Sequence, residues 1–80
     1  METRVSLIGI IVKNPGSVEQ LNCILHEYSQ YIIGRMGIPY REKGVNIISV
    51  AVDAPMDVIN NISGKIGRLN GISAKTIMPK

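Results

Sequence analysis

Hydrophobic and polar residues follow two different periods along the chain and divide it into six segments. Four segments are rich in β-branched apolar residues and are typical of strands, namely Arg4–Lys13, Tyr31–Tyr40, Val45–Asp53 and Ile72–Met78. In the other two segments apolar residues recur every three or four positions, which predicts amphipathic helices. These helices run from Val18 to about Ser29 and from about Pro55 to Leu69. The predicted order is therefore β-α-β-β-α-β.

Turn-forming residues separate these segments. Ser17 closes the stretch Asn14-Pro15-Gly16-Ser17, and Gln20 follows it three residues later, which predicts a capping box at the first helix. Glu42-Lys43-Gly44 predicts a tight hairpin between the second and third strands. Asn70-Gly71 ends the second helix.

Six elements in this order predict an α+β, ferredoxin-like βαββαβ fold. Right-handed crossovers place both helices on one face of a four-stranded antiparallel sheet, with the first and third strands in the middle. A chain of 80 residues is short for two domains, so we expect one domain over residues 1–80.

The two central strands are apolar on both faces of the predicted sheet. One face carries Ile8, Ile10, Val12, Ile48, Val50 and Val52, and the other carries Val5, Leu7, Ile11, Val45, Ile47 and Ala51. A monomer would expose an apolar patch larger than the few hundred Å² that monomers usually tolerate. We therefore expect a homodimer or homotetramer, formed through the helix-free face or the sheet edges. A monomer that hides this face under loops is the alternative, although the chain has no long loop.

Composition narrows the class of protein. The chain contains no Phe and no Trp, so the core must be aliphatic, and Cys23 is its only cysteine. A single cysteine excludes an internal disulfide framework and favours a reducing, cytoplasmic setting. The apolar run Val5–Val12 is too short to span a membrane, so we expect neither a signal peptide nor an anchor. The net charge of +3 permits nucleic-acid binding without requiring it.

Cys23 and His26 are three residues apart on the first predicted helix and are the only nucleophile and base of note. A catalytic dyad would need a third orienting group and oxyanion donors, which the sequence does not supply, so we expect no enzyme. As metal ligands the pair makes half of a tetrahedral site, and a symmetric second subunit would have to complete it. The simplest interpretation is a solvated histidine beside a tolerated cysteine.

The turn after the first strand is the best candidate for a ligand site. Backbone N–H groups at a helix start attract carboxylate or phosphate groups, which nominates Asn14, Pro15, Gly16 and Ser17. An ordinary turn and cap is the alternative. The stretch also resembles the Asn-x-Pro-Gly-x-Leu/Val pattern of ACT domains, in a compressed form because Asn14 directly precedes Pro15. That resemblance implies a small-molecule effector, commonly an amino acid, bound at a subunit interface.

Positive charges gather on the predicted hairpin. Arg41 and Lys43 are the residues we expect to contact a protein or nucleic-acid partner, whereas solvated surface charge is the ordinary interpretation of such residues. No helix-turn-helix is present, because a hairpin separates the two helices.

A longer stretch resembles a specific family of short bacterial proteins. Residues Leu25–Pro55, with the run GRMGIPYREKG at Gly34–Gly44, and the later Ser63–Gly67 and Leu69-x-Gly71 are similar to iron-only hydrogenase system regulators. The resemblance implies a fold close to ACT domains and to the C-terminal domain of nickel-responsive regulators. It implies a regulatory role, inferred from association with the maturation and synthesis of iron-only hydrogenases, and no catalytic residues. The nickel-binding domain uses several histidines and a cysteine, whereas this chain has one of each. From these features we expect a homo-oligomeric, ligand-sensing module that acts on transcription or on a partner protein.

Overall fold

The structure is a computed structural model that describes residues 2–79, so the two ends of the predicted domain, Met1 and Lys80, lie outside the described residues. Its helices and strands follow the predicted order. They are β1 (Arg4–Val12), α1 (Val18–Glu27), β2 (Ile32–Tyr40), β3 (Val45–Ala54), α2 (Met56–Gly67) and β4 (Ile72–Ile77). The predicted βαββαβ fold is confirmed.

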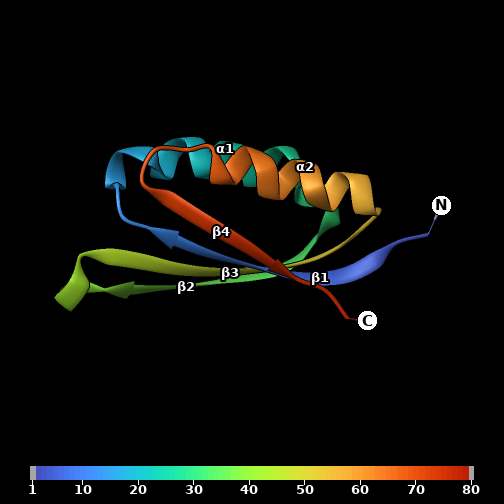
Figure 1. The fold of residues 1–80 in the computed structure, drawn as a ribbon, viewed down its shortest axis with the longest axis horizontal. Helices are drawn as coiled ribbons and strands as arrows, with labels where there is room; N and C mark the ends of the chain where they lie inside the picture. Colours follow the sequence, from blue (N-terminus) through green and yellow to red (C-terminus); the bar gives the residue numbers. More distant parts are fainter. Residues whose placement is uncertain (1, 80) are drawn as a thin grey trace.

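The four strands form one antiparallel sheet in the order β2-β3-β1-β4. Both helices lie on the same face of this sheet, so the molecule has two layers (Figure 1). The first and third strands are central, as right-handed crossovers require. The cross-strand register places Gly9 beside Ser49 on β3 and beside Lys75 on β4.

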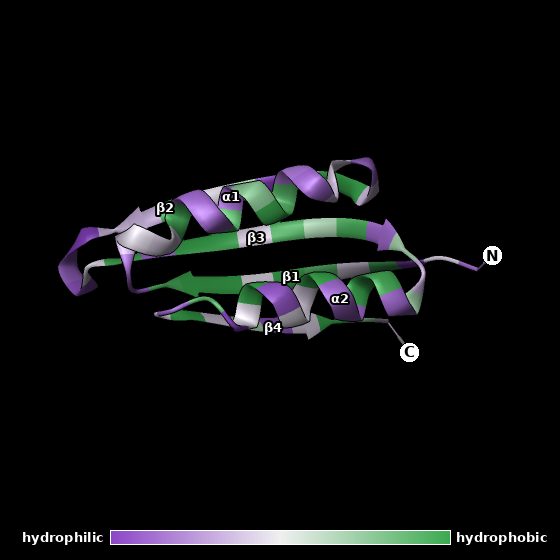
Figure 2. Cartoon of the chain, turned by 90° about the horizontal axis from the view of Figure 1, so that it is seen from above, coloured by the Kyte–Doolittle hydropathy of each residue, from purple (hydrophilic) through white to green (hydrophobic). Residues whose placement is uncertain are grey.

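The core lies between the helices and the sheet and is wholly aliphatic. Leu21 and Leu25 from α1 and Ile59, Ile62 and Ile66 from α2 are buried against the sheet. The sheet contributes Ile8, Ile10, Val12, Ile48, Val50, Val52, Ala54 and Ile72. Figure 2 shows β1 and β3 hydrophobic along most of their length, while hydrophilic residues occupy the outer sides of the helices.

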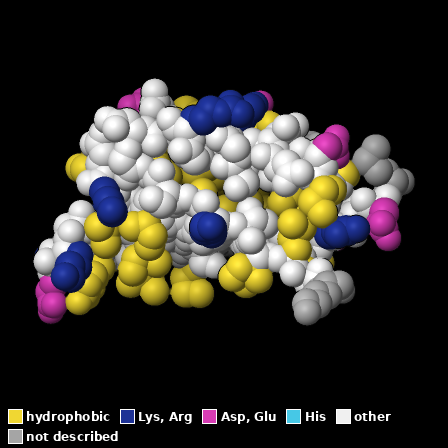
Figure 3. All heavy atoms as spheres, in the orientation of Figure 1, with side chains coloured by type: hydrophobic (Ala, Val, Ile, Leu, Met, Phe, Trp, Pro, Cys, Tyr) yellow, Lys and Arg dark blue, Asp and Glu magenta, His cyan; other side chains and the backbone are white. Residues whose placement is uncertain are grey.

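The opposite face of the sheet, called the open face below, is covered by no element among residues 2–79. Large apolar side chains on it remain exposed, namely Val5, Leu7, Met36, Ile38, Tyr40, Ile47 and Ile77. Hydrophobic side chains gather along this side of the molecule in Figure 3. The prediction that both sheet faces are apolar is confirmed, and the oligomer inferred from it stays a prediction.

Several element ends differ from the predicted ones. The capping-box prediction is wrong, because the Ser17 side chain makes no cap hydrogen bond and its hydroxyl instead donates to the Asn70 carbonyl at 2.6 Å. A 3₁₀ turn at Ser29–Tyr31 follows α1, so the helix ends at Glu27. The hairpin contains a further 3₁₀ turn at Arg41–Lys43. No helix of the described chain has the length and apolar character needed to cross a membrane.

Candidate functional site

The loop between β1 and α1 is held by the turn between α2 and β4. The backbone N–H of Lys13 donates to the Gly71 carbonyl at 2.7 Å, and Ser17 Oγ donates to the Asn70 carbonyl. Gly71 has a φ of 72°, and a Cβ at this position would lie 2.5 Å from the Cβ of Asn14. Glycine is therefore required at Gly71 both by its backbone conformation and by close packing.

The N–H groups that we expected to be free in this loop are engaged within it. Gly16 N–H donates to the Asn14 side-chain oxygen at 3.0 Å, and Ser17 N–H donates to the Asn14 carbonyl at 3.0 Å. Ser17 is also only 3% exposed, so its side chain stabilises the loop from within. An anion would have to displace the Asn14 side chain to reach Gly16 N–H, whereas Pro15 and Gly16 themselves are exposed.

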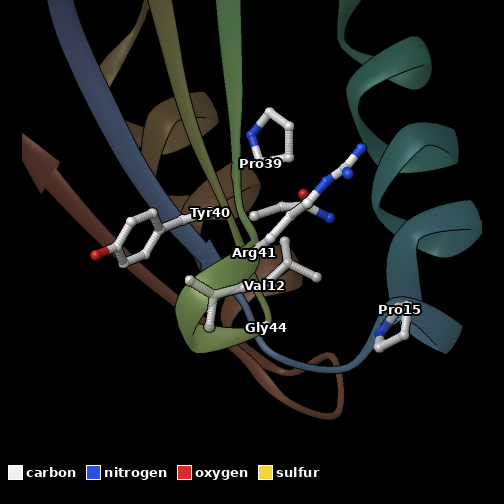
Figure 4. A pocket seen from close by; sticks show the side chains of 8 residues that line it. Val12, Pro15, Pro39, Tyr40, Arg41 and Gly44 are labelled. Carbon is white, nitrogen blue, oxygen red and sulfur yellow. The ribbon is translucent and has the colours of Figure 1, made fainter.

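A small hollow lies between this loop and the β2–β3 hairpin. Pro15 lines it from the loop and Arg41 from the hairpin, with Val12, Pro39 and Asn46 between them, and its volume is about 150 Å³. In Figure 4 the Arg41 side chain points toward α1, and the Tyr40 ring points away from it. The structure thus brings residues of the two predicted contact segments to one site. Lys43 does not line this hollow.

The hairpin turn Arg41–Lys43 carries one acidic residue, Glu42. The hydroxyl of Tyr40 donates to a carboxylate oxygen of Glu42 at 3.1 Å, which holds Glu42 on the Tyr40 side. The one ion pair among residues 2–79 joins Lys65 to Glu27, so the Arg41 guanidinium has no acidic partner there. An unpaired guanidinium beside an open hollow is suited to bidentate binding of a carboxylate or phosphate.

Asn46 is a site residue that was not predicted from the sequence. It lies on β3 in the same alternating series as Ile48, Val50 and Val52, which are buried under the helices. A polar amide in a series of buried aliphatic residues was the available signal. In the structure Asn46 is half-buried and lines the hollow with Arg41.

Cys23 and His26 are both exposed on the outer side of α1 and line a second hollow, together with Pro15 and Glu19. The described part of the chain contains no group of three His, Cys, Asp or Glu residues that could hold a metal ion. Residues 2–79 of one chain therefore supply an incomplete metal site. The pair needs ligands from another molecule to bind a metal tightly.

Lys65 connects the two helices and takes no part in either hollow. Its ammonium lies 3.2 Å from the Glu27 carboxylate and 5.1 Å from the centre of the Tyr28 ring. Interaction with the Tyr28 side chain, and then with Glu27, raises the pKa of Lys65 above its ordinary value. Arg35 is likewise engaged, donating to the Asn22 side chain at 3.2 Å. Of the basic residues on β2 and the hairpin, Arg41 is the one that lines the hollow with Pro15.

A family profile matches residues 4–76, and its description reads "TM1266-like: Iron-only hydrogenase system regulator, putative". The chain belongs to this family. Within the TM1266-like family, the uncharacterized protein TM1266 from Thermotoga maritima has a solved structure that is 34% identical to this chain. The two superpose with a TM-score of 0.93, over 99% of this chain and 100% of that one. The predicted family resemblance is confirmed.

A second solved structure, a formyltetrahydrofolate deformylase from Pseudomonas putida KT2440, is similar in fold alone. It is 16% identical to this TM1266-like chain, with a TM-score of 0.65 over 94% of the chain and 29% of the deformylase. This likeness supports the prediction that the fold is ACT-like. None of the curated proteins compared with the chain matches it.

Proposed function

We propose that this TM1266-like protein is a cytoplasmic, homo-oligomeric sensor that binds a small effector through a carboxylate or phosphate group. The effector occupies the hollow between Pro15 and Arg41, and the occupied protein acts on transcription or on a partner within an iron-only hydrogenase system. The observation that carries this proposal is the shared hollow, because it joins the loop matching the ACT pattern to an arginine without an acidic partner among residues 2–79.

The size of the hollow limits the effector. Its volume of about 150 Å³ is below the roughly 300–1,000 Å³ of typical ligand pockets. It therefore fits the charged group of an amino acid or a similar small acid better than a whole nucleotide. The ACT-like resemblance favours an amino acid, since ACT modules commonly bind one between subunits.

The same arginine offers a route from binding to response. Arg41 lies on the hairpin turn that also carries Lys43, the segment proposed to contact a nucleic acid or a protein partner. An anionic effector neutralises Arg41 and lowers the positive charge of this turn. Effector binding then changes the affinity of the turn for a negatively charged partner.

We expect Arg41→Gln to abolish stabilisation by the effector. A ligand at one hundred times its Kd adds about 2.7 kcal/mol, which raises the Tm of a domain this small by roughly 10 °C. The measurement is a thermal-shift screen of the full chain against amino acids, small organic acids and nucleotides. In Arg41→Gln the shift produced by the active compound should disappear.

Lys43→Gln is the matched control, because it removes the same charge from the same turn outside the hollow. It should keep the shift. Equal shifts in wild type and Arg41→Gln would show that the effector binds elsewhere, and no shift with any compound would contradict effector sensing.

Metal sensing is the second candidate, favoured by the common hollow of Cys23 and His26 on α1. Two such pairs across a two-fold axis give a tetrahedral set of two cysteines and two histidines. We expect the protein purified with added zinc or nickel to hold one ion per two chains and Cys23→Ser to lose it, as measured by elemental analysis. Wild-type protein that binds neither ion would eliminate this candidate.

A further inference from the structure

The open face has a trough across its centre. Gly9 on β1 and Ser49 on β3 are cross-strand partners, so the two central strands present no large side chain in this row. Met36 on β2 and Lys75 on β4 continue the same row to the sheet edges. The hollow above Gly9 and Ser49 has a volume of about 330 Å³.

An apolar ridge lies directly beside the trough. Ile11 and Ile47 are the cross-strand pair one row further along the open face, and both line the hollow. Ile47 is 39% exposed. A trough and a ridge of similar length in neighbouring rows make the surface self-complementary.

We propose that two copies of this chain pack open face to open face, with the ridge of each copy in the trough of the other. A two-fold axis perpendicular to the strands, midway between the two rows, produces this arrangement. It places the partner's Ile11 and the partner's Ile47 over Gly9 and Ser49. By symmetry, Ile11 and Ile47 of the first copy lie over the same trough of the partner, as an isologous interface requires. Strand directions stay nearly aligned, which is the commoner way for two sheets to pack.

The same axis pairs residues away from the centre. On β4 it places Lys75 opposite the partner's Ser73, because Lys75 lies in the row of Gly9 and Ser73 lies in the row of Ile11. On β2 it places Gly34 opposite the partner's Tyr40, a small residue against a large ring. The register thus matches complementary sizes and places no two like charges of the strands opposite each other.

The area of the face agrees with a stable dimer. In Figure 1 the sheet is seen edge-on, with its strands along the longest axis of the molecule and its width along the shortest axis. The molecule extends 41 Å along the longest axis and 17 Å along the shortest. These extents set an upper limit on the flat area of the open face, and this limit is of the order of the roughly 800 Å² that each partner buries in a standard-size interface. Among the described residues, the strands present only two charged side chains on this face, Asp53 and Lys75, and they are of opposite sign. Self-association therefore buries mainly apolar surface and meets no block of like charge.

Filling the trough tests the proposal. A Cβ at Gly9 meets nothing closer than the Lys75 carbonyl at 3.9 Å, so the folded chain accepts a larger residue there. By sedimentation equilibrium of the full chain, we expect Gly9→Leu to raise the dissociation constant of the dimer at least about 30-fold, a hot-spot-sized loss. Gly67→Leu adds the same side chain at the end of α2, where a Cβ meets nothing within 4 Å, and should leave association unchanged.

A charge exchange tests the register independently of the trough. The axis sets Lys75 opposite the partner's Ser73, so Ser73→Lys brings two lysines together and should weaken the dimer, and adding Lys75→Asp in the same chain should restore it. This pair also decides the outcome if Gly9→Leu does not fold by circular dichroism. A wild-type chain that stays monomeric at all accessible concentrations overturns the proposal. So does association that a folded Gly9→Leu leaves intact, or a double variant that fails to recover.

The inference rests on the homo-oligomeric part of the proposed function and is independent of the effector. A negative effector screen leaves these association measurements unchanged. Conversely, suppose that the chain is monomeric and that an effector still raises its Tm through Arg41. This result would contradict the proposed interface and support the proposed effector site.

Discussion

Replacing Gly71 by alanine is expected to destabilise the protein by about 2–6 kcal/mol. Two costs combine, since a non-glycine residue held at positive φ costs about 1–3 kcal/mol and overpacking costs a further 1–3 kcal/mol. Gly71 has a φ of 72°, and the added Cβ would lie 2.5 Å from Asn14 Cβ and 3.0 Å from Asn14 N. Asn14 N belongs to the backbone, and the position of Asn14 Cβ is fixed by the backbone. The loop itself must therefore move to accommodate the added methyl group. The measurement is the free energy of unfolding from urea titration at fixed protein concentration.

Gly44→Ala is the matched control for this experiment. Gly44 has a similar φ of 64°, but a Cβ there meets nothing within 4 Å. Only the conformational cost then applies, and we expect a loss of about 1 kcal/mol. If both variants lose the same stability, the close approach of Gly71 to Asn14 contributes nothing and the description of the loop as held by this turn is wrong.

The second large effect is expected at Ile62. This residue is 0% exposed near the middle of α2, and its side chain packs in the single aliphatic core. Truncation to alanine removes buried methyl groups and leaves a cavity, which costs about 2–5 kcal/mol. The buried residues of this core are all aliphatic, and Tyr28 and Tyr31 pack against it partly buried. The loss is measured as a lower urea midpoint with an unchanged slope.

Two further variants separate burial from chemistry at this site. Ile62→Val removes one methyl group and should cost about 0.5–1.5 kcal/mol. Ile33→Ala makes the same isoleucine-to-alanine change at a residue that is 62% exposed, and should alter stability by less than about 0.5 kcal/mol. Equal effects of Ile62→Ala and Ile33→Ala would contradict the position of the core between helices and sheet.

The architecture could be predicted because it depends on local periodicity. The β-branched apolar runs at Arg4–Lys13 and Val45–Asp53 indicated the central strands, which the structure places at Arg4–Val12 and Val45–Ala54. The apolar residues on both of their faces indicated an uncovered apolar face. The sequence also led to the TM1266-like family, which the match over residues 4–76 confirms. The regulatory role belongs to the family description, whereas effector binding and oligomerisation stay predictions.

The predictions failed where a long-range contact decided the local structure. Ser17 has the spacing of a helix cap, yet its hydroxyl is used by the Asn70 carbonyl from the other end of the chain. Local patterns carry no information about that partner. For the same reason the common hollow of Pro15 and Arg41 could not be predicted from the sequence, since the two lie on separate loops that only the folded sheet brings together.

The central position of β1 determines when the chain can fold during synthesis. β1 pairs with β3 and β4, and both of these strands are synthesised after it. Its turn is also fixed only when Asn70 and Gly71 are present. Until β4 is made, β1 keeps one apolar edge unpaired, a state prone to aggregation. Nascent chains that stop before β4 should therefore be the ones that chaperones retain.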